Sequence, residues 1–159
     1  MINFISQNIR FELKGKNSIR RWVNSTIKER GYKIGEINII FVSDNRLLEI
    51  NRSSLGHNYY TDIITFDYSA EILNGKIYAD LYISIDSVEE NSKTYKQLTT
   101  NKFEGELCRV IIHGILHLTG EDDLTKSKQI KMRKEENKYL QFIVEQIDNA
   151  SIKCSYKKD

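Results

Sequence analysis

The 159-residue sequence contains no proline, so its turns and helix ends must be formed by glycine, asparagine, aspartate, serine and threonine. It also lacks an apolar run near the roughly 20 residues that a membrane-spanning helix needs. The longest such run, from Val110 to Leu118, is interrupted by two histidines and a glycine. The first residues also lack the basic start followed by an apolar stretch that indicates a signal peptide. We therefore expect a cytoplasmic protein with no membrane partner.

Cysteine is scarce, since only Cys108 and Cys154 occur and neither has a cysteine neighbour at metal-ligand spacing. In a cytoplasmic protein we expect both as reduced thiols rather than as a disulfide. Cys108 is expected to be a small core residue. A composition of 40% hydrophobic and 29% charged residues excludes a disordered chain, a coiled-coil rod and a collagen-like repeat.

Charge of neither sign is in large excess, but it is unevenly distributed along the chain. Basic residues outnumber acidic ones by eight to two in residues 1–35 and by nine to five in residues 124–159, whereas residues 36–123 carry seven against fifteen. If the two basic ends lie together, they form a surface suited to phosphate. The alternative is two ordinary solvated helix faces. The polar side of the first predicted helix carries three of these cations, Arg20, Arg21 and Lys28.

Strands come first and helices dominate late, which favours one layered α/β or α+β domain, and we expect α+β over residues 1–150. The core of this domain is a small mixed β-sheet of about four strands packed with about five helices. Residues 151–159 form a C-terminal tail that we expect to be frayed from Lys153 onwards. β-branched and alternating patterns predict strands at 2–6, 10–13, 36–43, 61–68 and 76–86. Helical periodicity and capping residues predict helices at 17–30, 47–55, 86–97, 100–118 and 125–147.

Only three histidines occur, and two of them, His113 and His117, lie four residues apart in one predicted helix. Their imidazoles therefore share a face, one turn apart. Gly120 can adopt a left-handed conformation that reverses the chain, and Asp123 then completes the spacing H-x3-H-x2-G-x2-D. Asp122 is the poorer candidate for the third ligand because its span is shorter.

A histidine pair at this spacing is, by itself, more often a surface or buried polar pair. The glycine corner and the acidic third position favour a metal site instead. Three protein ligands leave a fourth position for water or substrate, which is typical of catalytic zinc, and zinc lowers the pKa of its bound water towards about 7. Peptidases of the H-E-x-x-H type place a glutamate after the first histidine. Here that position is Gly114, which argues against an ordinary peptidase.

The segment from Cys108 to Asp123, CRVIIHGILHLTGEDD, resembles the signature H-G-x-L-H-L-x-G-Y-D-H of the YbeY family of bacterial metal-dependent endoribonucleases. TDIITF at 61–66 and ADLYIS at 79–84 resemble two further family segments, and the similarity covers roughly residues 37–140. The resemblance implies a zinc-dependent endoribonuclease with one zinc per chain and a zinc-bound water as catalyst. It implies a role in rRNA maturation and ribosome quality control, with ribosomal RNA or the small ribosomal subunit as partner and no DNA.

Two departures from the family pattern concern the metal centre. The third histidine of the family is Asp123 here, and because aspartate also binds zinc, the resemblance carries the ligand role over to it. The predicted ligands are therefore His113, His117 and Asp123. The tyrosine that follows Gly120 in the family is Glu121 here.

A third departure concerns phosphate. The family has an arginine just before its T-D-V-L-S-F segment, and the corresponding position here is Leu55. His57 and Arg52 are the nearby candidates to replace it, against an ordinary solvated loop. The missing arginine favours an alternative function, a ribosome-assembly RNA-binding factor with a largely structural metal and little catalysis. The sequence identifies no catalytic general base.

Three further residues have two interpretations each. Asp62 and Asp80 are candidates to orient a ligand imidazole from behind, or are edge and turn residues. Trp22 lies in a basic helix where it can stack on a base, although we expect a core anchor.

Overall fold

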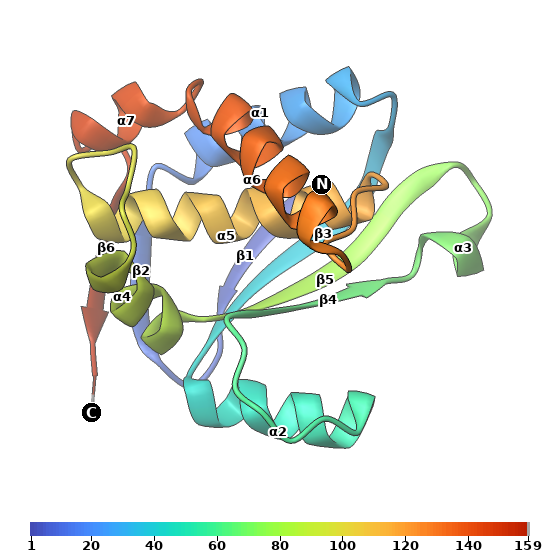
Figure 1. Cartoon of the computed structure of the whole chain (residues 1–159), viewed down its shortest axis with the longest axis horizontal. Coiled ribbons are helices and arrows are strands. Elements are labelled where there is room, and N and C mark those ends of the chain that lie inside the picture. Colours follow the sequence, from blue (N-terminus) through green and yellow to red (C-terminus); the bar gives the residue numbers. More distant parts are fainter. Residues whose placement is uncertain (159) are drawn as a thin grey trace.

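The computed structural model describes residues 1–158, and within them the chain forms seven helices and six strands (Figure 1). Four strands make one mixed sheet in the order β1, β3, β5, β4. β1, β3 and β5 are parallel, and β4 pairs antiparallel with β5 at one edge. The strands are β1 (Ile2–Ser6), β3 (Lys33–Val42), β4 (Ile63–Asp67) and β5 (Lys76–Ser84). The predicted α+β domain with a small mixed sheet is confirmed.

Alternation along the strands decides which layer each side chain joins. In β5, Leu81 and Ile83 are fully buried in the main core, while Tyr82 between them is half-buried. Helices α1 (Lys16–Glu29) and α5 (Lys102–Leu118) cover this face, and α2 (Asp44–Leu55) covers the opposite one (Figure 1). A smaller apolar cluster, made of Ile40, Val42, Leu47, Ile50 and Ile64, joins α2 to the sheet.

Helix α5 runs through the middle of the molecule, and most of its residues are buried. Gly114 is the point where it meets the sheet. A Cβ at that position would lie 2.7 Å from Leu81 and 2.8 Å from Ile63. Glycine therefore allows the close approach, and position 114 points towards the sheet.

The remaining helices are α3 (Ser69–Ile72), α4 (Ile85–Thr94), α6 (Lys126–Leu140) and α7 (Val144–Asp148). The prediction of one continuous helix over 125–147 is wrong. Backbone hydrogen bonds from Phe142 N to Tyr139 O and from Ile143 N to Leu140 O form a tighter turn between α6 and α7. Ile143, at the end of this turn, is buried. Among the described residues, no helix has the length and apolarity to cross a bilayer.

The expectation of a frayed tail is wrong, because β6 (Lys153–Lys157) pairs antiparallel with β2 (Arg10–Lys14). Ile152, just before β6, is fully buried, so it fixes this segment to the core. The strand pair brings the two basic ends of the chain together, with Lys14 opposite Lys153.

Two single-residue expectations hold. Cys108 is fully buried, and both cysteines are free. Trp22 is buried as well and donates a hydrogen bond from Nε1 to the backbone oxygen of Tyr139 at 2.8 Å, which supports its reading as a core anchor.

Candidate metal centre

The structure brings the three predicted ligand side chains together. His113 and His117 occupy one face of the last turns of α5, and Gly120, at φ +102°, turns the chain so that Asp123 folds back. The Nε2 atoms of the two histidines lie 3.0 Å apart. Asp123 Oδ2 lies 3.5 Å from His113 Nε2 and 3.7 Å from His117 Nε2. Asp122 points elsewhere, to Lys128 Nζ at 2.8 Å.

These separations fit a metal ion. Zinc bonds of 2.0–2.1 Å in a tetrahedral arrangement place ligand atoms about 3.4 Å apart. The observed triangle of 3.0, 3.5 and 3.7 Å is close to that size. Two imidazole nitrogens and one carboxylate oxygen are also a donor set that zinc accepts.

Hydrogen bonding behind the histidines supports the same conclusion. His117 Nδ1 lies 3.0 Å from the backbone oxygen of Glu121, which can only accept, so Nδ1 carries the proton. His113 Nδ1 lies 2.7 Å from Glu136 Oε2, a carboxylate that accepts in the same way. Both Nε2 atoms are left with lone pairs that face each other at 3.0 Å. Only a cation or a shared proton between them stabilises that arrangement.

Glu136 on α6 is the buried carboxylate that orients His113. It is 4% exposed, and Arg109 Nη1 donates to its Oε1 at 2.9 Å. Burial raises the pKa of Glu136, but its hydrogen bonds with His113 and Arg109 outweigh burial and the pKa is lowered. Burial likewise lowers the pKa of His113, and the bond with Glu136 reverses this, so the pKa is raised. A carboxylate behind a histidine ligand fixes its tautomer and raises its basicity.

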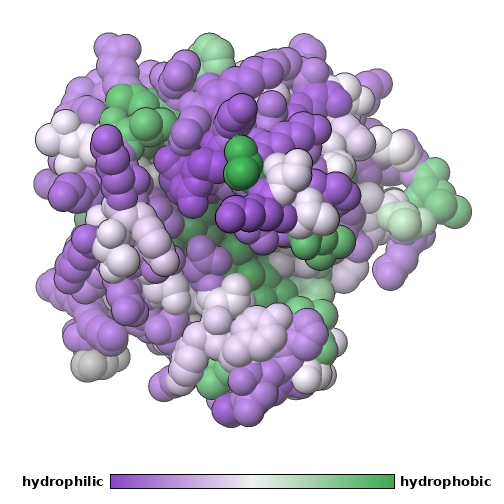
Figure 2. All heavy atoms as spheres, viewed as in Figure 1, coloured by the Kyte–Doolittle hydropathy of each residue, from purple (hydrophilic) through white to green (hydrophobic). Residues whose placement is uncertain are grey.

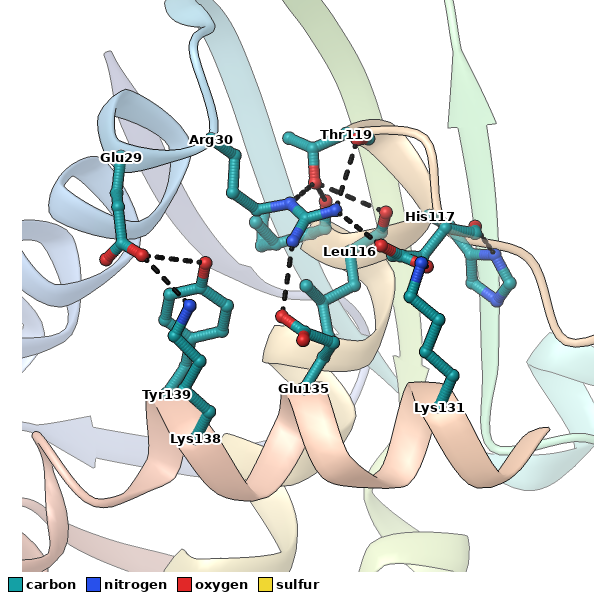
Figure 3. Close-up of polar contacts among 11 residues, drawn as sticks. Glu29, Arg30, Leu116, His117, Thr119, Lys131, Glu135, Lys138 and Tyr139 are labelled. Atoms are coloured by element: carbon teal, nitrogen blue, oxygen red, sulfur yellow. Dashed lines mark hydrogen bonds and ion pairs between the residues drawn. The ribbon is translucent and has the colours of Figure 1, made fainter. Parts of the chain in front are cut away.

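The loop of residues 119–123 is held in place by Arg30, the residue that follows α1 (Figure 3). Arg30 Nε donates to Thr119 Oγ1 at 2.7 Å, and its Nη2 pairs with Glu121 Oε1 at 2.9 Å. Lys131 on α6 reaches Glu121 Oε2 at 3.4 Å. The glutamate that replaces the family's tyrosine therefore ties the loop to α1 and α6, while its backbone oxygen orients His117.

A cleft of about 880 Å³ opens over the three candidate ligands, between α5, α6, β4 and the segment that precedes β4. Figure 2 shows this face hollowed, with apolar residues in the depression and polar residues around it. Asp62 and Glu106 line the cleft, and burial raises the pKa of both carboxyl groups. Arg109 and Arg133 contribute positive charge to its wall.

The structure separates the remaining candidates. His57 borders the cleft, whereas Arg52 does not line it and is hydrogen bonded to Asn58. Asp62 also borders the cleft, and its charge acts on His113. Asp80 does not line the cleft, and it accepts a hydrogen bond from Asn38 Nδ2 at 2.9 Å within the sheet.

Sequence reasoning missed the roles of Glu136, Arg109 and Arg133. One signal was available, since Arg109 precedes His113 by four residues, as His113 precedes His117, so all three share a helix face. Arg133 precedes Glu136 by three residues and lies 3.6 Å from it. Nothing in the local pattern indicates that Glu136 is buried against α5.

The chain is similar to a known protein family and to individual proteins over most of its length. A family model described as Endoribonuclease YbeY matches residues 1–144. The Endoribonuclease YbeY of Cytophaga hutchinsonii is 45% identical over 136 residues, which cover 85% of this chain and 91% of that protein. The protein of the same name from Flavobacterium psychrophilum is 44% identical over 142 residues, covering 89% and 96%. The solution structure of TM1509 from Thermotoga maritima has a TM-score of 0.63 at 28% identity and covers 95% of each chain.

Proposed function

The chain belongs to the YbeY family of endoribonucleases, and from this premise we propose that it is a zinc-dependent hydrolase that cleaves ribosomal RNA. On this proposal it acts in rRNA maturation and ribosome quality control in the cytoplasm, with the small ribosomal subunit as partner. One observation carries the proposal. Two histidines and an aspartate converge within 4.8 Å of one another in a cleft whose lining carries two arginines beside five carboxylates.

His113, His117 and Asp123 are the proposed ligands of one zinc ion per chain. When bound, zinc supplies Lewis acidity and makes hydroxide available at neutral pH. Glu136 and the carbonyl of Glu121 orient the two imidazoles for this role. Gly114 contributes no base, because its position faces Leu81 and Ile63 of the sheet.

Arg133 is the proposed replacement for the arginine that Leu55 displaces. Its side chain is 56% exposed, and it lines the cleft from α6, next to Glu136. A guanidinium in this position pairs with a phosphate oxygen in one or two hydrogen bonds. His57 borders the same cleft and is the second proposed phosphate contact.

The deciding experiment combines metal analysis of the purified protein with cleavage of ribosomal RNA, with and without a chelator. We expect one zinc per chain, cleavage by the untreated protein, and loss of cleavage but retention of RNA binding after chelation. The variant Arg133→Gln should retain zinc and lose cleavage.

The alternative is an RNA-binding assembly factor whose metal is structural, which the leucine at position 55 favours. It predicts that the zinc-loaded protein binds ribosomal RNA without cleaving it. It also predicts that chelation lowers the melting temperature and RNA affinity together. That pair of results would contradict the proposed catalytic role.

A further inference from the structure

A second concavity, of about 750 Å³, lies between α1 and the first residues of β1 and β3. Its lining contains no aspartate or glutamate. Within residues 1–158, no ion pair joins any of its cationic side chains to a carboxylate. We call it the α1 groove and define it by Arg20, Arg21, Lys28, Tyr32 and Lys33.

The positive charge of the α1 groove is held in place without being neutralised. Arg20 Nε donates to the backbone oxygen of Ile2 at 2.9 Å, and its guanidinium lies 5.2 Å from the ring centroid of Phe4. Both partners are uncharged, so the cation is fixed and its charge remains. Lys33 is the register partner of Lys76 on the adjacent strand, and both are exposed. Like charges on neighbouring strands are destabilising, and a bound polyanion relieves that cost.

The α1 groove begins beside the loop of residues 119–123. Tyr32 is 40% exposed, and its hydroxyl lies 3.7 Å from the position that a Cβ on Gly120 would occupy. Arg30, two residues before Tyr32, is hydrogen bonded to Thr119 and forms an ion pair with Glu121, in the loop that carries the third proposed ligand. From Lys28 to Arg20 the helix then extends about 12 Å away from that loop.

We propose that the α1 groove binds the sugar-phosphate backbone of the RNA strand that extends from the metal centre. The inference rests on the proposed function, because it takes RNA as the substrate. Lysine and arginine contacts to phosphate read no sequence, so the groove adds affinity and register to any strand. Tyr32 adds a face on which one base stacks.

The test compares two variants of the zinc-loaded full chain that remove equal charge. The groove variant is Arg21→Gln, Lys28→Gln, Lys33→Gln, which spares Arg20 because of its bond to Ile2. The control variant is Lys93→Gln, Lys96→Gln, Lys102→Gln, three exposed lysines from the acidic middle of the chain that do not line the groove. Binding of a fluorescent single-stranded ribosomal RNA fragment is titrated at several salt concentrations, and zinc content and melting temperature are measured alongside.

For the groove variant we expect the slope of log affinity against log salt to fall by about 2, since three phosphate contacts contribute about 0.7 each. The control variant should change the slope by less than half of that, and both should retain one zinc per chain. In addition, Tyr32→Leu should weaken binding about fivefold or more, whereas Tyr32→Phe keeps the stacking face and the affinity.

Two outcomes overturn the inference. An equal loss of slope in both variants would show a diffuse effect of net charge. An unchanged slope in the groove variant, with normal binding by the unmodified protein, would show that the RNA runs elsewhere and that the groove serves another partner, such as an acidic protein segment. If the unmodified protein fails to bind RNA at all, the proposed function itself is contradicted.

Discussion

The two histidines of the candidate metal centre lie one helical turn apart, yet different parts of the molecule orient them. His113 donates to Glu136, a buried side chain on α6. His117 donates to the backbone carbonyl of Glu121, in the loop that also carries Asp123. We call the first arrangement the helix half of the site and the second the loop half.

The difference predicts how each half responds to change. The helix half depends on a buried charge that Arg109 neutralises at 2.9 Å, and removing one partner of a buried pair is strongly destabilising. The loop half depends on backbone conformation, because no side-chain substitution removes the carbonyl of Glu121. Zinc affinity should therefore depend on charge in the helix half and on backbone conformation in the loop half.

The largest effect is expected from removing a ligand. His113→Ala or His117→Ala should each abolish stoichiometric zinc, because each histidine is one of only three proposed protein ligands. Elemental analysis measures the zinc content. The matched control is His57→Ala, which removes the remaining histidine and should retain one zinc per chain. If the double variant of positions 113 and 117 still held one zinc, the metal site would lie elsewhere.

The third ligand tests the loop half directly. Asp123→Ala should weaken zinc binding more than Asp122→Ala, since Asp122 is already paired with Lys128. Asp123→His should preserve binding because imidazole is an equally good ligand for zinc. A competition titration with a chromogenic chelator measures the affinities. Failure of Asp123→His to take up zinc would count against this ligand.

A matched pair of glutamate substitutions separates the two halves. Glu136→Gln should lower zinc affinity about 10- to 100-fold and lower the free energy of unfolding by about 3 kcal/mol, because Arg109 loses its buried counter-ion. Glu121→Gln removes a charge but keeps the carbonyl that orients His117, so its zinc affinity should change only a few-fold. Chemical denaturation and zinc titration measure the two effects. Equal losses of zinc affinity would remove the distinction between the halves.

The smallest effect is expected from the glycine corner of the loop half. Gly120→Ala and Gly31→Ala both place a side chain at positive φ, +102° and +89°, and each should lower the free energy of unfolding by about 1–2 kcal/mol. Only Gly120→Ala should also weaken zinc binding, because only this turn positions Asp123. A similar zinc affinity in the two variants would show that the corner conformation is unimportant for the ligand.

Much of the fold and the centre of the site could be predicted from the sequence, because the decisive patterns are local. His113 and His117 share a face through helical spacing alone. β-branched runs predict the sheet strands, and β3 and β5 are found where those runs lie. The predictions failed where the chain meets distant segments. Residues 153–157 carry weak strand signals and become a strand only because β2 is available to pair with them.

Tertiary structure alone decided what surrounds the candidate metal centre. Arg109 and Glu136 are 27 residues apart on different helices, and whether they meet depends on how α5 and α6 cross. The α1 groove likewise joins cations of α1 to Lys33 of β3. The sequence by itself determined the ligand spacing, because a helix repeats every 3.6 residues wherever it is placed. The groups that orient those ligands are brought to them by packing between α5, α6 and the loop, and no local periodicity encodes that packing.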